Sequence, residues 1–260
     1  MEYFIIFTFV SIFIYFLFLR WQHSMIFSPV CYRESHLNEM CKLLSLETSD
    51  KVELEGVVYE PKVVKSTIIY FGGRSQDAVG LIEPLSKNFS DFRIVTFNYR
   101  SYGKSEGKVN EKNIFNDALE VTNLVKKEYG DFYLVGFSLG SSVAAFVGSQ
   151  IKTSSIFLLG AFDSMASLAL KKYFFTTLFN ETHLEVLLKY SFRTKEHVQS
   201  IDELIHLFVS KNDQVTYIDN ARNLKAHIPN LGLYIEYDDL DHKDILWDFR
   251  VIEKMKEQMK

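Results

Sequence analysis

One serine lies in a sequence context that favours nucleophilic chemistry. Ser138 is the central residue of Gly-Phe-Ser-Leu-Gly at 136–140, which directly follows the apolar run 132–135 and precedes the helix-forming run 141–145. A serine on such a strand-to-helix turn projects its hydroxyl above the sheet, and the flanking glycines allow the chain to approach closely. The N-terminus of the following helix carries unpaired N–H groups that stabilise an oxyanion. We therefore expect Ser138 to attack an acyl carbonyl.

A serine hydroxyl needs a general base, and the base needs a carboxylate that orients it. His242 lies in a polar loop between the last strand-like run and the last helix-like segment, and it is the expected base. Asp213 directly follows the seventh strand-like run and completes the order Ser, Asp, His along the chain. Asp163, just beyond the sixth run, is the alternative carboxylate. The sequence favours Asp213.

The oxyanion formed by such an attack needs two N–H donors. One expected donor is the backbone N–H of Leu139, directly after the serine. The other should come from the loop after the third strand, where Gly72 and Gly73 precede Arg74. We expect this donor at Gly73 or Arg74, because paired glycines permit a close approach of the backbone. The Arg74 side chain is also a candidate contact for an anionic leaving group or head group.

Positioning these residues requires strands that end at one edge of a sheet. Eight short apolar runs bounded by turn residues are expected strands, at 43–46, 52–59, 67–71, 93–97, 132–135, 156–159, 204–209 and 231–236. From the third run onward they alternate with helix-length segments at 76–89, 111–129, 139–149, 215–226 and 243–258. This alternation predicts an α/β fold with a mostly parallel eight-stranded sheet and helices on both faces. The first two runs predict an antiparallel edge.

The segment 163–200 interrupts the alternation and is expected to form a short helical cap. Its apolar side chains are candidates for lining an acyl-binding groove, for contacting a membrane surface or for packing the cap onto the body. They are Leu168, Leu170, Tyr173, Phe174, Phe175, Leu178 and Phe179. Packing onto the body is favoured for most of them.

The N-terminal segment has the composition of a membrane span. Residues 3–19 contain no charge, proline or glycine and consist mainly of Phe, Ile and Leu, and a helix of this length just crosses a hydrocarbon core of about 30 Å. Glu2 before the run and Arg20 after it differ from the basic start and small-residue cleavage site of a signal peptide. We expect residues 1–22 to form a transmembrane anchor and 23–260 the catalytic domain. A buried core helix is the alternative.

Charge and cysteine content exclude several functional classes. The formal net charge of −4 and the pI near 6.0 give no reason to expect nucleic acid as a partner. Cys31 and Cys41 are too few for a disulfide scaffold or a zinc site, so two free thiols are expected, with a single disulfide as the alternative. We expect no metal and no organic cofactor. Arg20 and Arg33, on the C-terminal side of the apolar segment, favour a cytoplasmic domain.

Several motifs together resemble the α/β-hydrolase superfamily over residues 40–258. They are the glycine loop at 69–74, Asn-Tyr-Arg-Ser-Tyr-Gly-Lys-Ser-Glu-Gly at 98–107, the serine turn at 136–140, Asp213 and Asp241-His242. The 98–107 stretch and the anchor look like membrane-associated hydrolases of the Bem46 type, a resemblance that implies acyl esters or protein thioesters as substrates. The chain has Gly-Gly-Arg at 72–74 where that family usually has His-Gly-Asn, and Ser101 where it usually has glycine.

Together these features predict a membrane-anchored serine hydrolase that cleaves carboxylic esters or thioesters through an acyl-enzyme on Ser138. In this prediction His242 takes the hydroxyl proton and Asp213 fixes the tautomer of the imidazole. An acyltransferase or a peptidase would form the same acyl-enzyme, so both remain alternatives. A non-catalytic, membrane-tethered binding module is the alternative from another functional class.

Overall fold

A single mixed sheet forms the centre of the protein. The structure is a computed structural model and describes residues 2–31, 37–173 and 179–259. The eight strands are β1 (Cys41–Glu47), β2 (Glu53–Tyr59), β3 (Thr67–Phe71), β4 (Arg93–Phe97), β5 (Phe132–Phe137), β6 (Ile156–Leu159), β7 (Ile205–Ser210) and β8 (Leu231–Tyr237). They follow the spatial order β1-β2-β4-β3-β5-β6-β7-β8.

The strand directions confirm the predicted architecture. β1 pairs with β2 and β2 with β4 in antiparallel fashion, whereas all pairs from β4 through β8 are parallel. β3, β5, β6 and β7 are buried along their whole length, as the continuous apolar runs indicate, whereas β8 is mostly half-buried and β1 mixes half-buried with exposed residues. The carboxyl ends of the parallel strands therefore meet at one edge, where ligands bind in folds of this kind.

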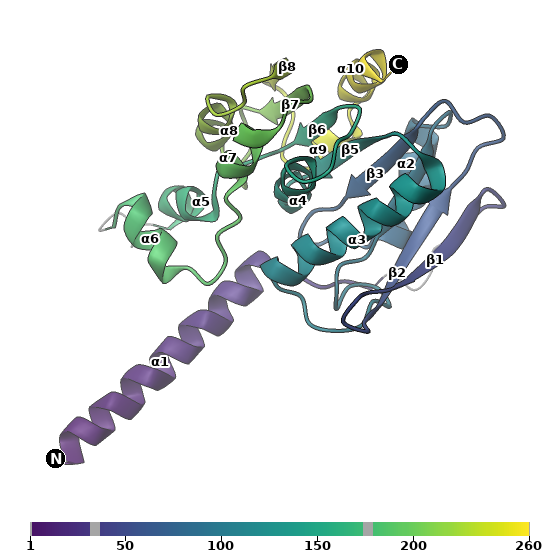
Figure 1. Cartoon of the computed structure of the whole chain (residues 1–260). Coiled ribbons are helices and arrows are strands. Elements are labelled where there is room, and N and C mark those ends of the chain that lie inside the picture. The colour runs from purple at the N-terminus through teal and green to yellow at the C-terminus, as the bar shows by residue number, and fades with distance from the viewer. Residues whose placement is uncertain (1, 32–36, 174–178, 260) are drawn as a thin grey trace.

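Helices cover both faces of the sheet (Figure 1). One apolar cluster packs α3 (Glu111–Tyr129), α4 (Leu139–Gly148) and α8 (Ile218–Lys225) on one face, and a second packs α2 (Ala78–Asn88), α9 (Asp244–Trp247) and α10 (Phe249–Gln258) on the other. The single helix expected over 243–258 is wrong, because the backbone of Asp248 is extended and its carboxylate caps α10 by accepting from the Arg250 N–H.

Between β6 and β7 lie α5 (Met165–Lys172), α6 (Glu181–Leu187), α7 (Thr194–His197) and the 3₁₀ turn η2 (Val198–Ser200).

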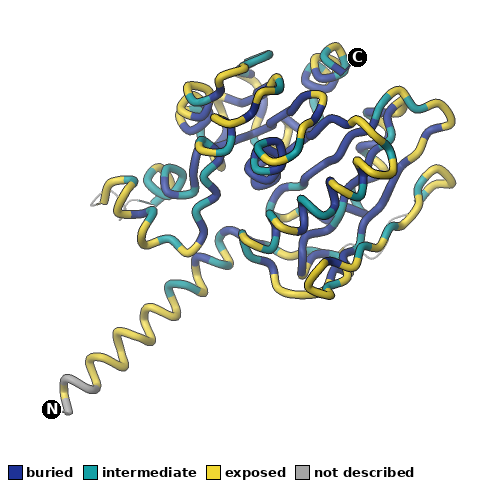
Figure 2. Tube along the Cα trace, viewed as in Figure 1, coloured by how far each residue is buried: buried dark blue, intermediate teal, exposed yellow. Residues whose placement is uncertain are grey.

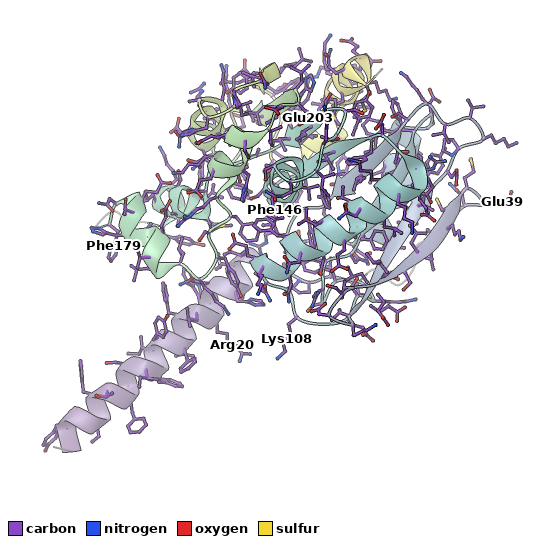
Figure 3. The ribbon with its side chains drawn as sticks, in the orientation of Figure 1. Arg20, Glu39, Lys108, Phe146, Phe179 and Glu203 are labelled. Atoms are coloured by element: carbon purple, nitrogen blue, oxygen red, sulfur yellow. The ribbon has the colours of Figure 1, made fainter. Side chains whose placement is uncertain are left out.

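The N-terminal helix α1 (Glu2–Ile26) projects away from the rest of the molecule (Figure 1). Its segment Ile6–Ile26 is long and apolar enough to cross a membrane, and only 6% of that apolar window is buried. Figure 2 shows that α1 is mainly exposed and that its buried residues lie at its C-terminal end. Figure 3 shows side chains projecting from the helix on all sides along its length. The alternative of a buried core helix is therefore excluded, and α1 is a candidate membrane span.

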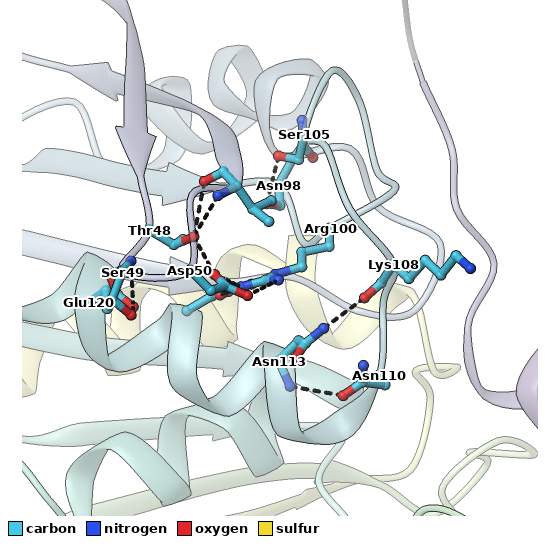
Figure 4. A network of polar contacts seen from close by, with 12 residues as sticks. Thr48, Ser49, Asp50, Asn98, Arg100, Ser105, Lys108, Asn110, Asn113 and Glu120 are labelled. Atoms are coloured by element: carbon cyan, nitrogen blue, oxygen red, sulfur yellow. Dashed lines mark hydrogen bonds and ion pairs between the residues drawn. The ribbon is translucent and has the colours of Figure 1, made fainter.

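A buried arginine fixes the chain after β4. Arg100 donates to both carboxylate oxygens of Asp117 on α3 at 2.8 and 2.7 Å, and to both oxygens of Asp50 at 2.7 and 2.8 Å (Figure 4). Such paired bidentate contacts suit the planar guanidinium. At the next residue, Ser101 has a φ of 68°, a conformation that glycine adopts more easily, and its hydroxyl donates to the Gly107 carbonyl at 2.8 Å. The segment 98–107 is thus joined to α3 and to the turn between β1 and β2.

Candidate active site

The turn between β5 and α4 holds Ser138 in a strained conformation. Its φ of 53° and ψ of −118° lie in a region that non-glycine residues rarely occupy, and its N–H donates to the Leu159 carbonyl at 2.9 Å. Steric contacts with the backbone require glycine at both flanking positions, 136 and 140. A Cβ on Gly136 would lie 2.3 Å from the Gly140 carbonyl oxygen, and a Cβ on Gly140 would lie 2.0 Å from the Phe71 oxygen. The turn therefore presents Ser138 as the sequence predicts.

Three side chains from different strand ends form one hydrogen-bonded chain. His242, between β8 and α9, has its Nε2 3.0 Å from Ser138 Oγ and its Nδ1 2.6 Å from Asp213 Oδ2. When Nδ1 carries the proton donated to Asp213, Nε2 is left to accept the serine proton. The structure therefore brings together the three residues that the sequence selected.

The Asp213 carboxylate is itself held in place. Its Oδ1 accepts from the N–H groups of Val215 and Thr216 at 2.7 and 2.8 Å, and its Oδ2 accepts from the Thr216 hydroxyl at 2.6 Å. Burial acts to raise the pKa of Asp213, but the hydrogen bond and charge of His242, together with Thr216, outweigh it and hold the pKa below its ordinary value. Asp213 thus remains ionised beside the imidazole.

Asp163, the alternative carboxylate, is occupied elsewhere. It is fully buried, and its two oxygens accept from the side-chain amides of Asn220, at 2.9 Å, and Asn223 on α8. Its backbone carbonyl accepts from the Lys195 N–H at 2.9 Å. Asp163 therefore joins the segment after β6 to α8, and the geometry favours Asp213 as the partner of His242.

The two alternatives for the second oxyanion donor differ in their hydrogen bonding. The Gly73 N–H donates to Gln76 Oε1 at 2.7 Å, whereas no acceptor in the described part of the chain engages the Arg74 N–H. Gly73 still has to be small, because a Cβ there would lie 3.1 Å from the Phe137 ring and 3.5 Å from Ser138 Cβ. Of the two alternatives, the Arg74 N–H is therefore the one left without a protein acceptor among the described residues, as an oxyanion donor has to be.

The oxyanion loop, residues 72–74 after β3, is held by side chains to which the sequence analysis assigned no role. Tyr99 Oη donates to the Gly72 carbonyl at 2.8 Å, and Tyr102 Oη donates to the Arg74 carbonyl at 2.6 Å. Gln76 Oε1 accepts from the Tyr70 hydroxyl at 2.8 Å in addition to the Gly73 N–H. Both tyrosines after β4 belong to the 98–107 motif that carried the family resemblance. That motif therefore positions the loop beside the nucleophile.

A mainly apolar cavity of about 110 Å³ adjoins Ser138. Leu168 and Tyr173 of the expected cap line it, whereas Leu170 does not and Phe179 is exposed. Phe174, Phe175 and Leu178 lie outside the described residues. The remaining lining residues are Trp21, Gln22, Met25, Ile26, Arg74, Leu139, Phe162, Met165, Ala169, Lys172, Leu188, Val215 and Thr216. The four from α1 were not expected at the site, because the sequence offers no signal that joins residues 21–26 to Ser138.

Two further observations concern polar chemistry near the site. Arg74 Nη1 donates to the Met25 carbonyl at the C-terminal end of α1 at 2.5 Å, so its guanidinium supports the helix end, and Arg74 also lines the cavity. Among the described residues, no group of three or more His, Cys, Asp or Glu side chains is arranged to hold a metal. Cys31 and Cys41 are free thiols.

Comparisons with known proteins agree with the fold described above. A family model described as the alpha/beta hydrolase fold matches residues 70–183. The esterase Pf2001 of Pyrococcus furiosus superimposes with a TM-score of 0.69 at 20% identity, over 90% of this chain and 99% of that one. An acetyl xylan esterase from Paenibacillus sp. R4 gives 0.69 at 11% identity, over 86% of each chain.

The chain has the α/β-hydrolase fold.

Within this α/β-hydrolase fold, the matched family region contains the glycine loop and the serine turn, whereas Asp213 and His242 lie beyond it. A sequence relative, the uncharacterized protein R595 of Acanthamoeba polyphaga mimivirus, is 31% identical over 108 residues. That stretch is 39% of this chain and 37% of the relative, so the chain matches little more than a third of that protein's length.

Proposed function

We propose that this protein is a serine hydrolase that cleaves carboxylic esters or thioesters, with Ser138 as nucleophile, His242 as general base and Asp213 as the group that orients it. The observation that carries the proposal is the continuous hydrogen-bonded chain from Asp213 through His242 to Ser138 Oγ. A serine presented on a strained turn and paired with an oriented imidazole is the arrangement that acyl transfer requires.

The reaction proceeds in two halves. Ser138 Oγ attacks the acyl carbonyl while its proton passes to His242 Nε2, and the oxyanion lies against the N–H groups of Leu139 and Arg74. His242 then protonates the departing alcohol or thiol, leaving an acyl ester on Ser138. Water deprotonated by His242 attacks that ester, His242 returns the proton to Ser138 Oγ as the acyl C–O bond breaks, and the acid leaves. Throughout, Asp213 stabilises the imidazolium, and neither a metal nor an organic cofactor takes part.

The substrate is proposed to carry an apolar acyl group, and the protein is proposed to be anchored by α1. The cavity beside Ser138 is lined mostly by apolar side chains, and α1 exposes large apolar residues along a length sufficient to span a bilayer. The tyrosines of the 98–107 motif, together with such a helix, support assignment to the membrane-associated Bem46-type branch. Arg20, directly after the apolar run, supports a cytoplasmic catalytic domain.

The test is labelling of the full chain, solubilised in detergent, with a fluorophosphonate probe, in parallel with hydrolysis of acyl esters and thioesters. Wild type should label and Ser138→Ala should not, since the probe reacts only with an activated serine. If folded wild type neither labels nor hydrolyses any ester, a tethered binding module replaces the hydrolase. If it labels but releases acyl groups only to an added alcohol, thiol or amine, it is an acyltransferase. Cleavage of amides alone would indicate a peptidase.

A further inference from the structure

The C-terminal end of α1 is built into the wall of the catalytic cavity. Trp21, Gln22, Met25 and Ile26 line the same cavity as Ser138 and Leu139. These four positions follow the i, i+1, i+4, i+5 spacing of one face of a helix. An anchor that only tethered the domain would need no residue near the nucleophile, whereas here four residues of the helix line the cavity beside it.

The contact between α1 and the domain is specific and extensive. Gln22 is buried, and its amide donates to the Leu187 carbonyl at 3.4 Å and accepts from the Lys189 N–H at 2.8 Å. His23 Nδ1 lies 2.9 Å from the hydroxyl of Tyr190. At the opposite side, the Arg74 guanidinium donates to the Met25 carbonyl. The end of α1 is therefore fixed both to the segment after α6 and to the oxyanion loop.

The cavity is lined by two helices, α5 and α1, and only α1 continues into the long apolar segment. On one side α5 contributes Leu168 and Ala169, and on the other α1 contributes Met25 and Trp21. On the N-terminal side of Arg20 α1 is apolar, with Leu17, Phe16 and Phe13 each more than half exposed. An acyl chain that leaves Ser138 along α1 stays against apolar side chains from the cavity to the segment expected in the bilayer.

We propose that the C-terminal end of α1 forms one side of the acyl-binding cavity. The substrate is then a long-chain acyl ester held in the bilayer, and its chain reaches Ser138 between α1 and α5. The inference rests on the proposed hydrolase function. Met25 and Trp21 are then specificity-determining residues, because they contact the chain and not the reacting carbonyl. The ester group meets the nucleophile at the end of the membrane span, so the chain need not leave its apolar surroundings.

The first test is chain-length specificity of the full-length protein in phosphatidylcholine vesicles. Met25→Trp places a larger side chain in the cavity, and Ser24→Trp places the same side chain at the neighbouring exposed position outside it. For 4-nitrophenyl esters from acetyl to palmitoyl, Met25→Trp should lower kcat/KM for long chains while sparing acetyl, by about fourfold per methylene displaced. Ser24→Trp should retain the wild-type profile. An unchanged profile in a Met25→Trp protein that still labels would overturn the proposal.

The second test uses the wild-type chain and does not depend on whether a variant folds. A fluorophosphonate with a long alkyl chain carrying a terminal diazirine reacts when Ser138 Oγ displaces fluoride from phosphorus, and the liberated proton passes to His242. Irradiation then links the chain end to its neighbours. Crosslinked peptides should contain residues of α1, whereas crosslinks confined to α5 or the body would overturn the proposed wall. Failure of the probe to label Ser138 at all would instead reject the hydrolase function.

Discussion

Two buried aspartates beyond neighbouring strands have different roles because their neighbours differ. Asp213 follows β7 and accepts from one imidazole, one hydroxyl and two backbone N–H groups, and that imidazole also contacts Ser138 Oγ. Asp163 follows β6 and accepts from two side-chain amides of α8. Sequence order favoured Asp213, but the reason why Asp163 is unsuitable lies in Asn220 and Asn223, which are more than fifty residues away and meet it only in the folded chain.

We predict that Asp213→Asn and Asp163→Asn separate catalysis from stability. Asp213→Asn should lower kcat by roughly 10⁴-fold, as in the serine proteases, because the amide no longer fixes the tautomer of His242. Asp163→Asn should leave kcat near wild type while reducing the free energy of unfolding by about 1–3 kcal/mol, because a buried acceptor is lost. Ester hydrolysis and urea unfolding measure the two effects. The reverse pattern would mean that Asp163, and not Asp213, orients His242.

The second oxyanion donor marks the limit of prediction at this scale. The sequence places it at Gly73 or Arg74, since both follow β3. The choice depends on Gln76, whose side chain folds back and occupies the Gly73 N–H. A side chain that returns to its own loop leaves no periodicity or spacing in the sequence, so the sequence indicates the glycine pair but not which N–H group is left without a protein acceptor.

The hydroxyl of Tyr99 provides a second residue-level prediction. Tyr99→Phe removes the hydrogen bond to the Gly72 carbonyl and should lower kcat by about fivefold with little change in KM, because the loop that carries the oxyanion donor loses about 1 kcal/mol of support. The matched control is Tyr59→Phe, which removes a similar bond from a buried tyrosine to the Ser90 carbonyl on another loop. Equal kcat values for the two variants would contradict this positioning role.

At the level of elements, apolar runs predicted all eight strands, and most clearly β3, β5, β6 and β7, because buried parallel strands need continuous apolar sequence. The last helix was expected to be continuous, yet it divides at Asp248, whose carboxylate caps α10. Helical periodicity continues through such a break, so the pattern does not reveal it. Pairing irregularities are also hidden, and the register between β7 and β8 shifts between Ile205 and Leu207.

That irregular pair contains a buried histidine with a defined role. His206 is 1% exposed, its ring stacks on Phe157 with a centroid distance of 4.7 Å, and its Nδ1 accepts from the Leu233 N–H at 3.1 Å. Gly232 leaves room for the ring, because a Cβ there would lie 2.6 Å from the imidazole. The neutral imidazole thus replaces a missing strand acceptor.

We predict that this histidine makes stability depend on pH. Burial lowers the pKa of His206 below its ordinary 6.5, so the unfolded chain binds the proton more readily than the native state. Its contribution is therefore complete above about pH 6.5 and is lost as the pH falls below that value. Urea unfolding between pH 7.5 and 5.5 should show this decline, and His206→Gln should reduce its slope. Burial also lowers the pKa of His197, so some slope should remain.

At the scale of the whole molecule, the sequence predicted an anchor ending at residue 22 and a separate domain beginning at 23. In the structure α1 continues to Ile26, and its C-terminal end packs on the rest of the chain. The apolar composition of residues 3–19 predicted a span, since spanning depends on length and hydrophobicity alone. The docking of residues 21–27 depends on Tyr190, Leu187 and the loop after β3, which no local pattern connects to α1.

If residues 3–19 span the membrane and residues 21–27 pack on the domain, two N-terminal deletions should have different outcomes. Removing residues 2–19 should release the protein from carbonate-washed membranes and leave a folded domain that labels with a short-chain fluorophosphonate, because Gln22, Ile26 and Phe27 remain. Removing residues 2–27 also deletes Ile26 and Phe27, which are 7% and 2% exposed, and should cost about 3–6 kcal/mol of stability.

Sedimentation, probe labelling and thermal unfolding distinguish these outcomes. If the shorter deletion remained membrane-bound, the anchor would have to lie elsewhere in the chain, whereas loss of folding in that variant would mean that residues 2–19 stabilise the domain directly. If both deletions folded equally well, the contacts of residues 20–27 would contribute little, and α1 would be a tether alone. The expected result, a soluble and reactive shorter deletion beside an unstable longer one, would place the boundary between anchor and enzyme inside a single helix.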